Sequence, residues 1–330
     1  MSTGRGPSRR LWSGPLLAGL LALLSVAACS TGSGDSDRYH DGLLFIATGN
    51  TTGTYYQFGG GYADLVSKHL PGYKMRAEPT GASGENISRV DTGDMDLALS
   101  HADTAADGVL GQGIFPGRPQ RVVALARLYD NIAQVVVRTN PKIHTLADLR
   151  GKRVSTGTLN SGTDVVAGRM LEAAGLDADR DLTRLRWSLS ETTKGMKAGT
   201  LDAFIFVSGL PTTGVTELFT TAPGQFGFLP VGDVLIGMNQ RHGGIYQATT
   251  IAKSVYNTAA DIATVAIPSM LVVSPDVPEE LAYQLTKVLF EHQGELATAH
   301  AEGANFTAAT ARLTDPVPLH PGARRFYEHG

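Results

Sequence analysis

Four short segments of this sequence combine glycine with hydroxyl and amide side chains in a spacing that suits ligand binding. They are the turn inside Leu43–Leu70 and the segments Thr80–Asn86, Ser155–Asp164 and Phe206–Thr213. Each lies between a predicted strand and a predicted helix, where backbone N–H groups are unpaired and the helix dipole adds partial positive charge. One such turn is ordinary, but four of them predict a cleft that binds an anion such as a carboxylate.

We predict that the ligand contacts these turns and the end of the strand Asp96–Ser100, because ligands of open α/β sheets bind at the carboxyl ends of strands. The predicted ligand-binding residues are Gly53, Thr54, Tyr55, Tyr56, Gly81, Ser83, Asn86, His101, Asp103, Ser161, Gly162, Thr163, Ser208 and Gly209. Tyr55 or Tyr56 would form an apolar wall with a polar tip. The same residue types cap helices, so a purely structural role is the alternative for each one taken singly.

Patterns that mark common enzymes are absent from the sequence. It contains no Gly-x-Ser-x-Gly, no His-Glu-x-x-His and no Gly-x-Gly-x-x-Gly after a strand. The Ser155–Asp164 turn lacks the lysine of a phosphate-binding loop. The nine histidines show no metal-ligand spacing, so we expect no metal and no other cofactor, although a pair such as His101 with Asp103 stays open. We therefore predict a binding protein and not an enzyme.

Local patterns predict the elements that position the turns. Leu43–Ile46 is an apolar strand, and the following helix is predicted to bury Phe58, Tyr62, Leu65, Val66 and Leu70. Capping boxes are predicted at Thr54 with Gln57, at Ser161 with Asp164 and at Asp276 with Glu279, and Ser83 is predicted to be an N-cap. Two long apolar strands, Val122–Arg138 and Thr264–Ser274, are predicted to connect two parts of the fold, with Pro268 at an edge or a bend.

The first 28 residues have the features of an export signal. Three arginines precede the apolar run Leu16–Leu24, which is too short to span a bilayer comfortably, and Val26-Ala27-Ala28-Cys29 follows. This tetrapeptide resembles the lipobox of bacterial lipoproteins, which implies cleavage before Cys29 and a lipid on its sulfur. The alternatives are an ordinary signal peptide with a chance cysteine and, because Ser8–Trp12 resembles a twin-arginine signal, export by that route.

Composition narrows the possible partners. Cys29 is the only cysteine, so no disulfide can form within one chain. Removal of three arginines with the signal leaves 25 of the 28 basic residues against 31 acidic ones, a net charge of −6, which suits neither nucleic acid nor an anionic membrane surface. Residues 29–41 are polar and are predicted to be a flexible tether. About 290 residues remain, enough for two lobes.

Several of these motifs occur in the order and spacing of a known family. The segments ATGNTTGTYYQFGGGYADL, EPTGASGEN, GDMDLALSHAD, KRVSTGTLNSGTDVVA and AFIFVSGLPTTGVTEL, with the C-terminal PLHPGARRFYEHG, resemble the TAXI family of substrate-binding proteins. That family serves tripartite ATP-independent periplasmic (TRAP) transporters and binds small carboxylates, glutamate and glutamine among them. The sequence departs from the family at Asn50, Ala82 and His101, each of which adds atoms at the predicted cleft.

The resemblance implies an α/β protein of the type II periplasmic-binding-protein fold, in which two α/β lobes are joined by crossing hinge strands. It places lobe 1 at residues 42–130 and 270–330, lobe 2 at residues 131–269, and the hinge strands near 131–138 and 264–274. It also implies that the lobes close on the ligand and that the loaded protein docks on a TRAP-type membrane permease. The location would be extracytoplasmic, with the chain anchored to the cell membrane through Cys29.

Two alternatives belong to other functional classes. One is a lipid-anchored sensor domain of the same fold, which would report its ligand to a signalling partner. The other is a hydrolase that uses His101 and Asp103 as its base.

Overall fold

A computed structural model describes residues 38–139 and 143–329. The predicted signal peptide, the lipidation site Cys29 and most of the predicted tether lie outside the described residues. At the end of that tether, Tyr39–Gly42 forms a 3-10 helix (η1), and Nδ1 of His40 lies 2.7 Å from a carboxylate oxygen of Asp96. These last tether residues therefore contact the folded domain.

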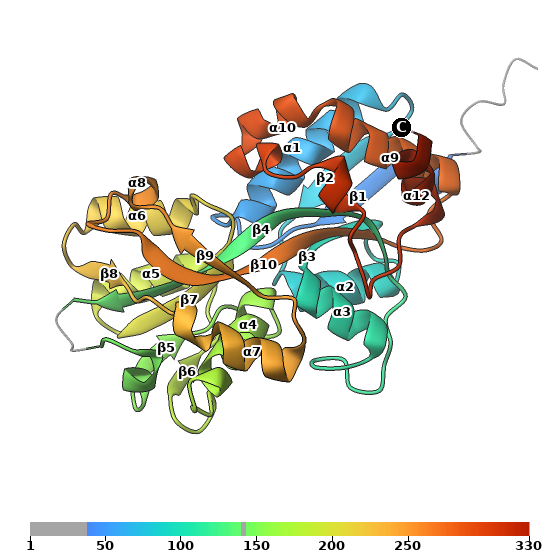
Figure 1. The fold of residues 1–330 in the computed structure, drawn as a ribbon. Coiled ribbons are helices and arrows are strands. Elements are labelled where there is room, and N and C mark those ends of the chain that lie inside the picture. The colour runs from blue at the N-terminus through green and yellow to red at the C-terminus, as the bar shows by residue number, and fades with distance from the viewer. Residues whose placement is uncertain (1–37, 140–142, 330) are drawn as a thin grey trace, which may run out of the picture. The chain divides into compact units, whose positions relative to one another are not determined.

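One mixed sheet of ten strands runs through the domain (Figure 1). The strand order is β2-β1-β3-β10-β4-β7-β5-β6, with β8 paired to β4 and β9 to β10. The bounds are β1 Leu43–Ala47, β2 Lys74–Glu78, β3 Leu97–His101, β4 Val123–Arg138, β5 Arg153–Ser155, β6 Thr183–Leu185, β7 Ala203–Ser208, β8 Phe226–Phe228, β9 Gln247–Ile251 and β10 Ile262–Val273. The parallel pairs β1–β2, β1–β3, β5–β6 and β5–β7 form the two outer parts.

The two long strands belong to both parts of the sheet. β4 has 16 residues and pairs antiparallel with β10 and then with β7, whereas β10 pairs with β9 through its first half and with β3 through its second. Pro268 lies opposite Asp130 beside a register shift, where the missing N–H of proline interrupts the ladder least. Of the two predicted positions for Pro268, the edge is wrong because β10 is a central strand, and the register shift shows irregular pairing beside the proline.

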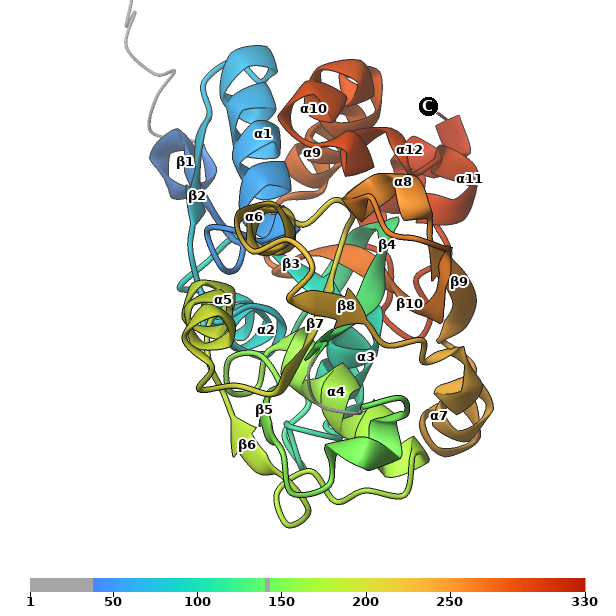
Figure 2. The same ribbon diagram turned by 90° about the vertical axis from the view of Figure 1, so that its left-hand side faces the viewer.

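Helices cover both faces of the sheet (Figures 1 and 2). Their bounds are α1 Thr54–His69, α2 Ser83–Asp91, α3 Ala102–Leu110, α4 Gly162–Ala173, α5 Leu189–Ala198, α6 Thr213–Thr221, α7 Leu235–His242, α8 Lys253–Tyr256, α9 Glu279–Glu291, α10 Gln293–Ala299, α11 Ala308–Ala311 and α12 Pro321–His329. Further 3-10 helices are η2 Leu146–Leu149, η3 Gly232–Val234 and η4 Ala301–Ala304.

Three apolar clusters hold these layers together. One joins α1 and α9 to β1, β3, β4 and β10, a second joins α5 and α6 to β7, and a third runs under the other face from α2 and α3 to α4 and α7. The predicted buried face of α1 is confirmed, because Phe58, Tyr62, Leu65 and Val66 are all at most 5% exposed. Burial of such side chains stabilises a fold by about 1.5–3 kcal/mol each.

Two predicted N-caps are wrong because their hydroxyls have distant partners. Thr54 is the first residue of α1, its N-cap is Gly53, and its hydroxyl donates to the carbonyl of Gly209 (3.1 Å). The side chain of Gln57 closes no capping box and donates instead to Thr213. Ser83 is likewise the first residue of α2, and its Oγ accepts a hydrogen bond from the backbone N–H of His101 (3.0 Å).

The other predicted caps give a mixed result. Ser161 is the N-cap of α4 and accepts from the N–H of Asp164 (3.1 Å), as predicted. The Asp164 carboxylate does not complete a box, because other groups bind it. Helix α9 starts at Glu279 with Pro278 as its N-cap, so the prediction for Asp276 is wrong.

Candidate functional site

The four predicted turns meet around one cavity of about 30 Å³, which we call the central cavity. They follow β1, β2, β5 and β7, and they start α1, α2 and α4 and lead to α6. The lining residues are Gly49, Asn50, Gly53, Thr54, Tyr55, Ala82, Ser83, His101, Asn131, Thr158, Ser161, Gly162, Thr163, Phe206, Val207 and Ser208. The lining includes nine of the predicted ligand-binding residues, namely Gly53, Thr54, Tyr55, Ser83, His101, Ser161, Gly162, Thr163 and Ser208.

Five predicted residues lie outside this lining. Asn86 is buried and holds two strands at their ends, since its Nδ2 donates to the carbonyls of Thr48 and Leu99 (both 2.7 Å). The carbonyls of Gly81 and Gly209 accept hydrogen bonds from the hydroxyls of Thr158 and Thr54. The remaining two are Tyr56, which is half-buried, and Asp103, which pairs with an arginine. Asn86, Gly81 and Gly209 therefore stabilise the turns through hydrogen bonds.

Sequence reasoning found the strand residues His101 and Ser208 but missed three other lining residues that come from strands. Asn131 of β4 is the clearest case, because its side chain is fully buried in the long central strand. A polar residue inside a buried strand was the available signal. Phe206 and Val207 of β7 give no such signal, because their side chains look like ordinary core residues.

Asn131 belongs to a buried hydrogen-bond network between α1 and the long strands β4 and β10. Its Nδ2 donates to Ser269 Oγ (2.6 Å) and to Tyr55 Oη (3.3 Å), and the two hydroxyls lie 3.2 Å apart. Burial raises the pKa of Tyr55 above its usual value, so the phenol is neutral at physiological pH. The Tyr55 ring meets the His101 ring edge-on, with centroids 5.9 Å apart. The network thus connects the start of α1 to β4 and β10.

Two buried polar atoms of the cavity wall have no hydrogen-bond partner in the described part of the chain. They are Nδ1 of His101 and Oδ1 of Asn131. Burial lowers the pKa of His101, so its ring is neutral at physiological pH, although the charge of Asp103 acts in the opposite direction. A buried polar group without a partner costs about 1–3 kcal/mol, and native proteins contain few of them. Both residues line the central cavity, where the backbone of Gly162 packs against the His101 ring.

The cavity lining contains no charged side chain among the described residues. It offers hydroxyls, an amide, a neutral imidazole and the starts of three helices. His101 and Asp103 share no hydrogen bond in the described structure, because the Asp103 carboxylate accepts from Thr104, Arg169 and Tyr246 instead. The arrangement therefore suits binding of a polar molecule and lacks the oriented base that a hydrolase needs.

Glycines allow the turns to approach one another closely across the cavity. A Cβ on Gly162 would lie 2.4 Å from His101 Nδ1 and 2.5 Å from Ser83 Oγ, and a Cβ on Gly84 would lie 2.4 Å from the carbonyl oxygen of Asn160. Direct hydrogen bonds also cross the gap, from Gly84 N–H to the Asn160 carbonyl (3.1 Å) and from Thr54 N–H to Ser208 Oγ (3.3 Å). The structure is thus a closed arrangement of the two halves.

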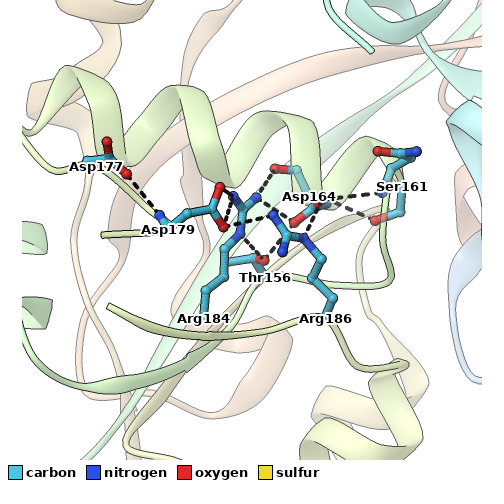
Figure 3. Close-up of polar contacts among 8 residues, drawn as sticks. Thr156, Ser161, Asp164, Asp177, Asp179, Arg184 and Arg186 are labelled. Atoms are coloured by element: carbon cyan, nitrogen blue, oxygen red, sulfur yellow. Dashed lines mark hydrogen bonds and ion pairs between the residues drawn. The ribbon is translucent and has the colours of Figure 1, made fainter. Parts of the chain in front are cut away.

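The α4 turn is held in shape by an ion-pair network beneath it (Figure 3). The Asp164 carboxylate accepts from the Thr156 hydroxyl (2.7 Å) and pairs with Arg184 and Arg186. Both arginines also pair with Asp179. These contacts fix the turn between β5 and α4, and with it the positions of Ser161 and Gly162.

A second set of contacts joins the same two halves of the sheet, and we call it the Arg169 cluster. Nη1 of Arg169 in α4 donates to Asp103 Oδ2 (3.0 Å) and to Tyr246 Oη (2.9 Å), and Nη2 donates to Asp107 Oδ2 (2.6 Å). The Asp103 side chain is 1% exposed, and those of Arg169 and Asp107 are 13% and 12% exposed. Burial raises the pKa of Asp107, against the effect of Arg169.

Two wider hollows flank the Arg169 cluster. Their volumes are about 470 and 720 Å³, and Arg169 and Asp107 line both. Neither contains an unpartnered buried side-chain atom among the described residues. The central cavity is smaller, but it combines the convergent turns with the unpartnered groups, and we take it as the candidate site.

Comparison with protein families gives a match to the NMT1-like family over residues 46–330. Among the described residues, no helix combines the length and the apolar character needed to cross a bilayer.

Solved structures share the fold at low sequence identity. The binding-protein component of an ABC phosphonate transporter from Pseudomonas aeruginosa has a TM-score of 0.55 at 12% identity, covering 79% of this chain and 78% of that chain. The alkanesulfonate-binding protein SsuA from Xanthomonas axonopodis pv. citri, bound to MOPS, has a TM-score of 0.50 at 17% identity, with coverages of 87% and 84%. A putative L-cystine ABC transporter from Listeria monocytogenes scores 0.50 at 15%, with coverages of 80% and 98%. The expected two-lobed periplasmic-binding-protein fold is confirmed.

Proposed function

This chain belongs to the NMT1-like family and is an extracytoplasmic solute-binding protein of a transporter, and on that premise we propose that it captures a small carboxylate by closure of its two lobes. The family and the structural neighbours are transport-binding proteins and not enzymes. One observation carries the proposal: the helix starts at Gly53–Tyr55, Ala82–Ser83 and Ser161–Thr163 meet at a polar cavity without charged lining residues. The ligand first binds to the turns that precede α1 and α2, and the turn that precedes α4 then closes over it.

The chemistry of the lining narrows the proposed ligand. A carboxylate is held by hydroxyls and helix N–H groups, as anions are at helix starts. Because no arginine or lysine is among the described lining residues, a dicarboxylate would bury charge without a partner, at a high cost. His101 Nδ1 and Asn131 Oδ1 favour a ligand that also carries an N–H donor. Within the glutamate, glutamine and organic-acid class, we therefore propose a glutamine-like amino acid or a monocarboxylate.

Ligand entry requires the lobes to separate. A cavity of about 30 Å³ holds about two water molecules, whereas ligand pockets are typically about 300–1,000 Å³. The long strands β4 and β10 are the connections that would flex, and the lobe boundaries near residues 131 and 270 stay a prediction. Gly84 and Gly162 then permit the close approach of the closed form.

A thermal-shift screen tests the ligand class. The chain from Ser30 onward is mixed with glutamine, glutamate, pyruvate, succinate and 2-oxoglutarate, and with ethanesulfonate and methylphosphonate as competing classes. A ligand at about a hundred times its Kd stabilises the folded state by about 2.7 kcal/mol. We expect a rise in Tm with a carboxylate, lost in His101→Ala and kept in His144→Ala, whose side chain is exposed. A rise only with the sulfonate or the phosphonate would refute the carboxylate proposal.

We further propose that the permease is of the TRAP type. The support is the sequence resemblance described above, while the structural neighbours named here include ABC transporter components. Membrane vesicles that contain the permease encoded next to this chain separate the two classes. Uptake that follows an ion gradient and persists without ATP would support a TRAP permease, and uptake that requires ATP would assign the protein to an ABC transporter. If the neighbouring gene encodes a histidine kinase, the sensor alternative gains support.

Anchoring through Cys29 is also a proposal. It rests on the Val26-Ala27-Ala28-Cys29 motif, which lies outside the described residues. Mass spectrometry of the membrane-extracted protein would show diacylglycerol on an N-terminal cysteine. A Cys29→Ser chain that stays in the membrane fraction would contradict this proposal.

A further inference from the structure

Two histidines and a glutamate meet on the surface between α1 and α10, outside the central cavity. The two helices lie side by side (Figures 1 and 2). His69 is the last residue of α1, His292 lies between α9 and α10, and Glu295 is in the first turn of α10. Nε2 of His69 is 3.0 Å and Nδ1 of His292 is 3.2 Å from the same carboxylate oxygen, Oε1 of Glu295.

The spacing of these atoms is close to that of metal ligands. Tetrahedral zinc with bonds of about 2.0–2.2 Å to nitrogen and oxygen separates its ligand atoms by about 3.3 Å. The two N–O distances already match this value, and all three ligand atoms lie within 4.8 Å of one another. The two imidazole rings are stacked, with centroids 3.5 Å apart and planes 10° apart, so one ring must rotate before both nitrogens point at a common ion.

We propose that His69, His292 and Glu295 bind a divalent transition metal such as zinc, with water in the remaining coordination position. Two imidazoles and one carboxylate form a ligand set that zinc accepts and that hard cations such as Mg²⁺ do not prefer. The metal replaces the protons that the rings share with the carboxylate. The site is reachable from solvent, because the three side chains are 22%, 26% and 42% exposed.

The surroundings of the site leave one carboxylate oxygen of Glu295 to a metal. Lys68 binds the other carboxylate oxygen, Oε2 of Glu295 (2.6 Å), and leaves Oε1 for the metal. His69 also ends a helix of 16 residues, and the partial negative charge of a helix C-terminus attracts cations.

Sequence reasoning predicted no metal site because the ligands are far apart in the chain. His69 and Glu295 are separated by 226 residues, and only the packing of α10 on α1 unites them. A bound metal would therefore join the first helix of the domain to its C-terminal segment. The site is independent of the proposed ligand, since none of its residues lines the central cavity.

Zinc titration of the purified chain tests the proposal. After removal of metals with a chelator, ZnCl₂ is added in competition with a chromophoric chelator, and Tm is recorded in parallel. We expect saturable binding of one ion per chain and a rise in Tm. In His69→Ala and Glu295→Gln the affinity should fall by about tenfold or more, since even outer-shell changes cost that much at metal sites.

A matched control separates this site from a chance His–Glu contact. His242 lies 3.0 Å from Glu172, and no third ligand group joins this pair among the described residues, so His242→Ala should bind zinc as the parent chain does. If His69→Ala unfolds, as judged by circular dichroism, His292→Gln replaces it, because that side chain lies in a turn between two helices. Absence of saturable binding, or equal loss in His242→Ala and His69→Ala, would overturn the proposal.

Discussion

The central cavity and the Arg169 cluster connect the same two halves of the sheet in opposite ways. Around the cavity the contacts are uncharged, run mostly through backbone groups and hydroxyls, and leave His101 Nδ1 and Asn131 Oδ1 without partners. In the Arg169 cluster the charges are buried, and Arg169 reaches two carboxylates and a phenol. The difference suggests that one set of contacts is built to separate and the other to stay together.

The energies of the two sets support this interpretation. Each neutral hydrogen bond across the cavity contributes about 0.5–1.5 kcal/mol, and water replaces it readily on opening. Breaking a buried ion pair by loss of one partner costs about 3–5 kcal/mol. The contacts around the cavity are therefore easier to replace with water than those of the Arg169 cluster.

The largest expected effect comes from breaking the Arg169 cluster. Arg169→Ala leaves the buried carboxylates of Asp103 and Asp107 without their cation. We expect the free energy of unfolding to fall by about 3–5 kcal/mol, measured by urea denaturation at pH 7.

An exposed ion pair is the control for that variant. Arg121 and Asp276 are each 64% exposed, and Arg121→Ala should change the free energy of unfolding by about 1 kcal/mol or less. If Arg169→Ala were no more destabilising than Arg121→Ala, the contrast between the two sets of contacts would be lost.

A smaller effect is expected when closure of the cavity is blocked. Gly162→Ala places a methyl group 2.4 Å from His101 Nδ1, and overpacking of this kind costs about 1–3 kcal/mol. This cost destabilises only the closed form. Small-angle X-ray scattering should therefore show a larger radius of gyration for the variant. Its ligand affinity should fall by about 5- to 150-fold.

Gly168 in the same helix provides the control. A Cβ there meets only Arg184 Nη2, at 3.8 Å, so Gly168→Ala should keep both the scattering curve and the affinity of the parent chain. A Gly162→Ala chain as compact as Gly168→Ala would show that closure does not depend on this glycine.

The sequence predicted those strands, helix faces and caps that depend on the pattern of neighbouring residues. Strand β4 was placed almost to the residue, and the apolar face of α1 was correct, because periodicity and burial are properties of neighbouring residues. The Ser161 cap was found for the same reason. Nine cavity residues followed from the rule that turns at strand ends face one another.

The failures concern partners that are distant in the chain. The Thr54 hydroxyl binds a carbonyl 155 residues away, and the Asp103 carboxylate binds Arg169 66 residues away, so neither role is visible in local spacing. Asn131 was missed because a long strand was interpreted only as a connector, although one of its two buried amides, Asn131, lines the cavity.

The smallest expected effect is a pH dependence that distinguishes the neutral cavity from the charged cluster. Burial lowers the pKa of His101 below 6.5, so the unfolded chain takes up a proton at higher pH than the folded one. The stabilisation is complete above about pH 6.5 and is lost as pH falls below it, by at most about 1.4 kcal/mol per pH unit for one group. His101→Gln should therefore flatten the decline in the free energy of unfolding between pH 6.5 and 5, measured by urea denaturation. Burial also lowers the pKa of His300, so His300→Gln should flatten the same decline in the free energy of unfolding. If His101→Gln left the decline unchanged, the cavity would not hold this imidazole neutral.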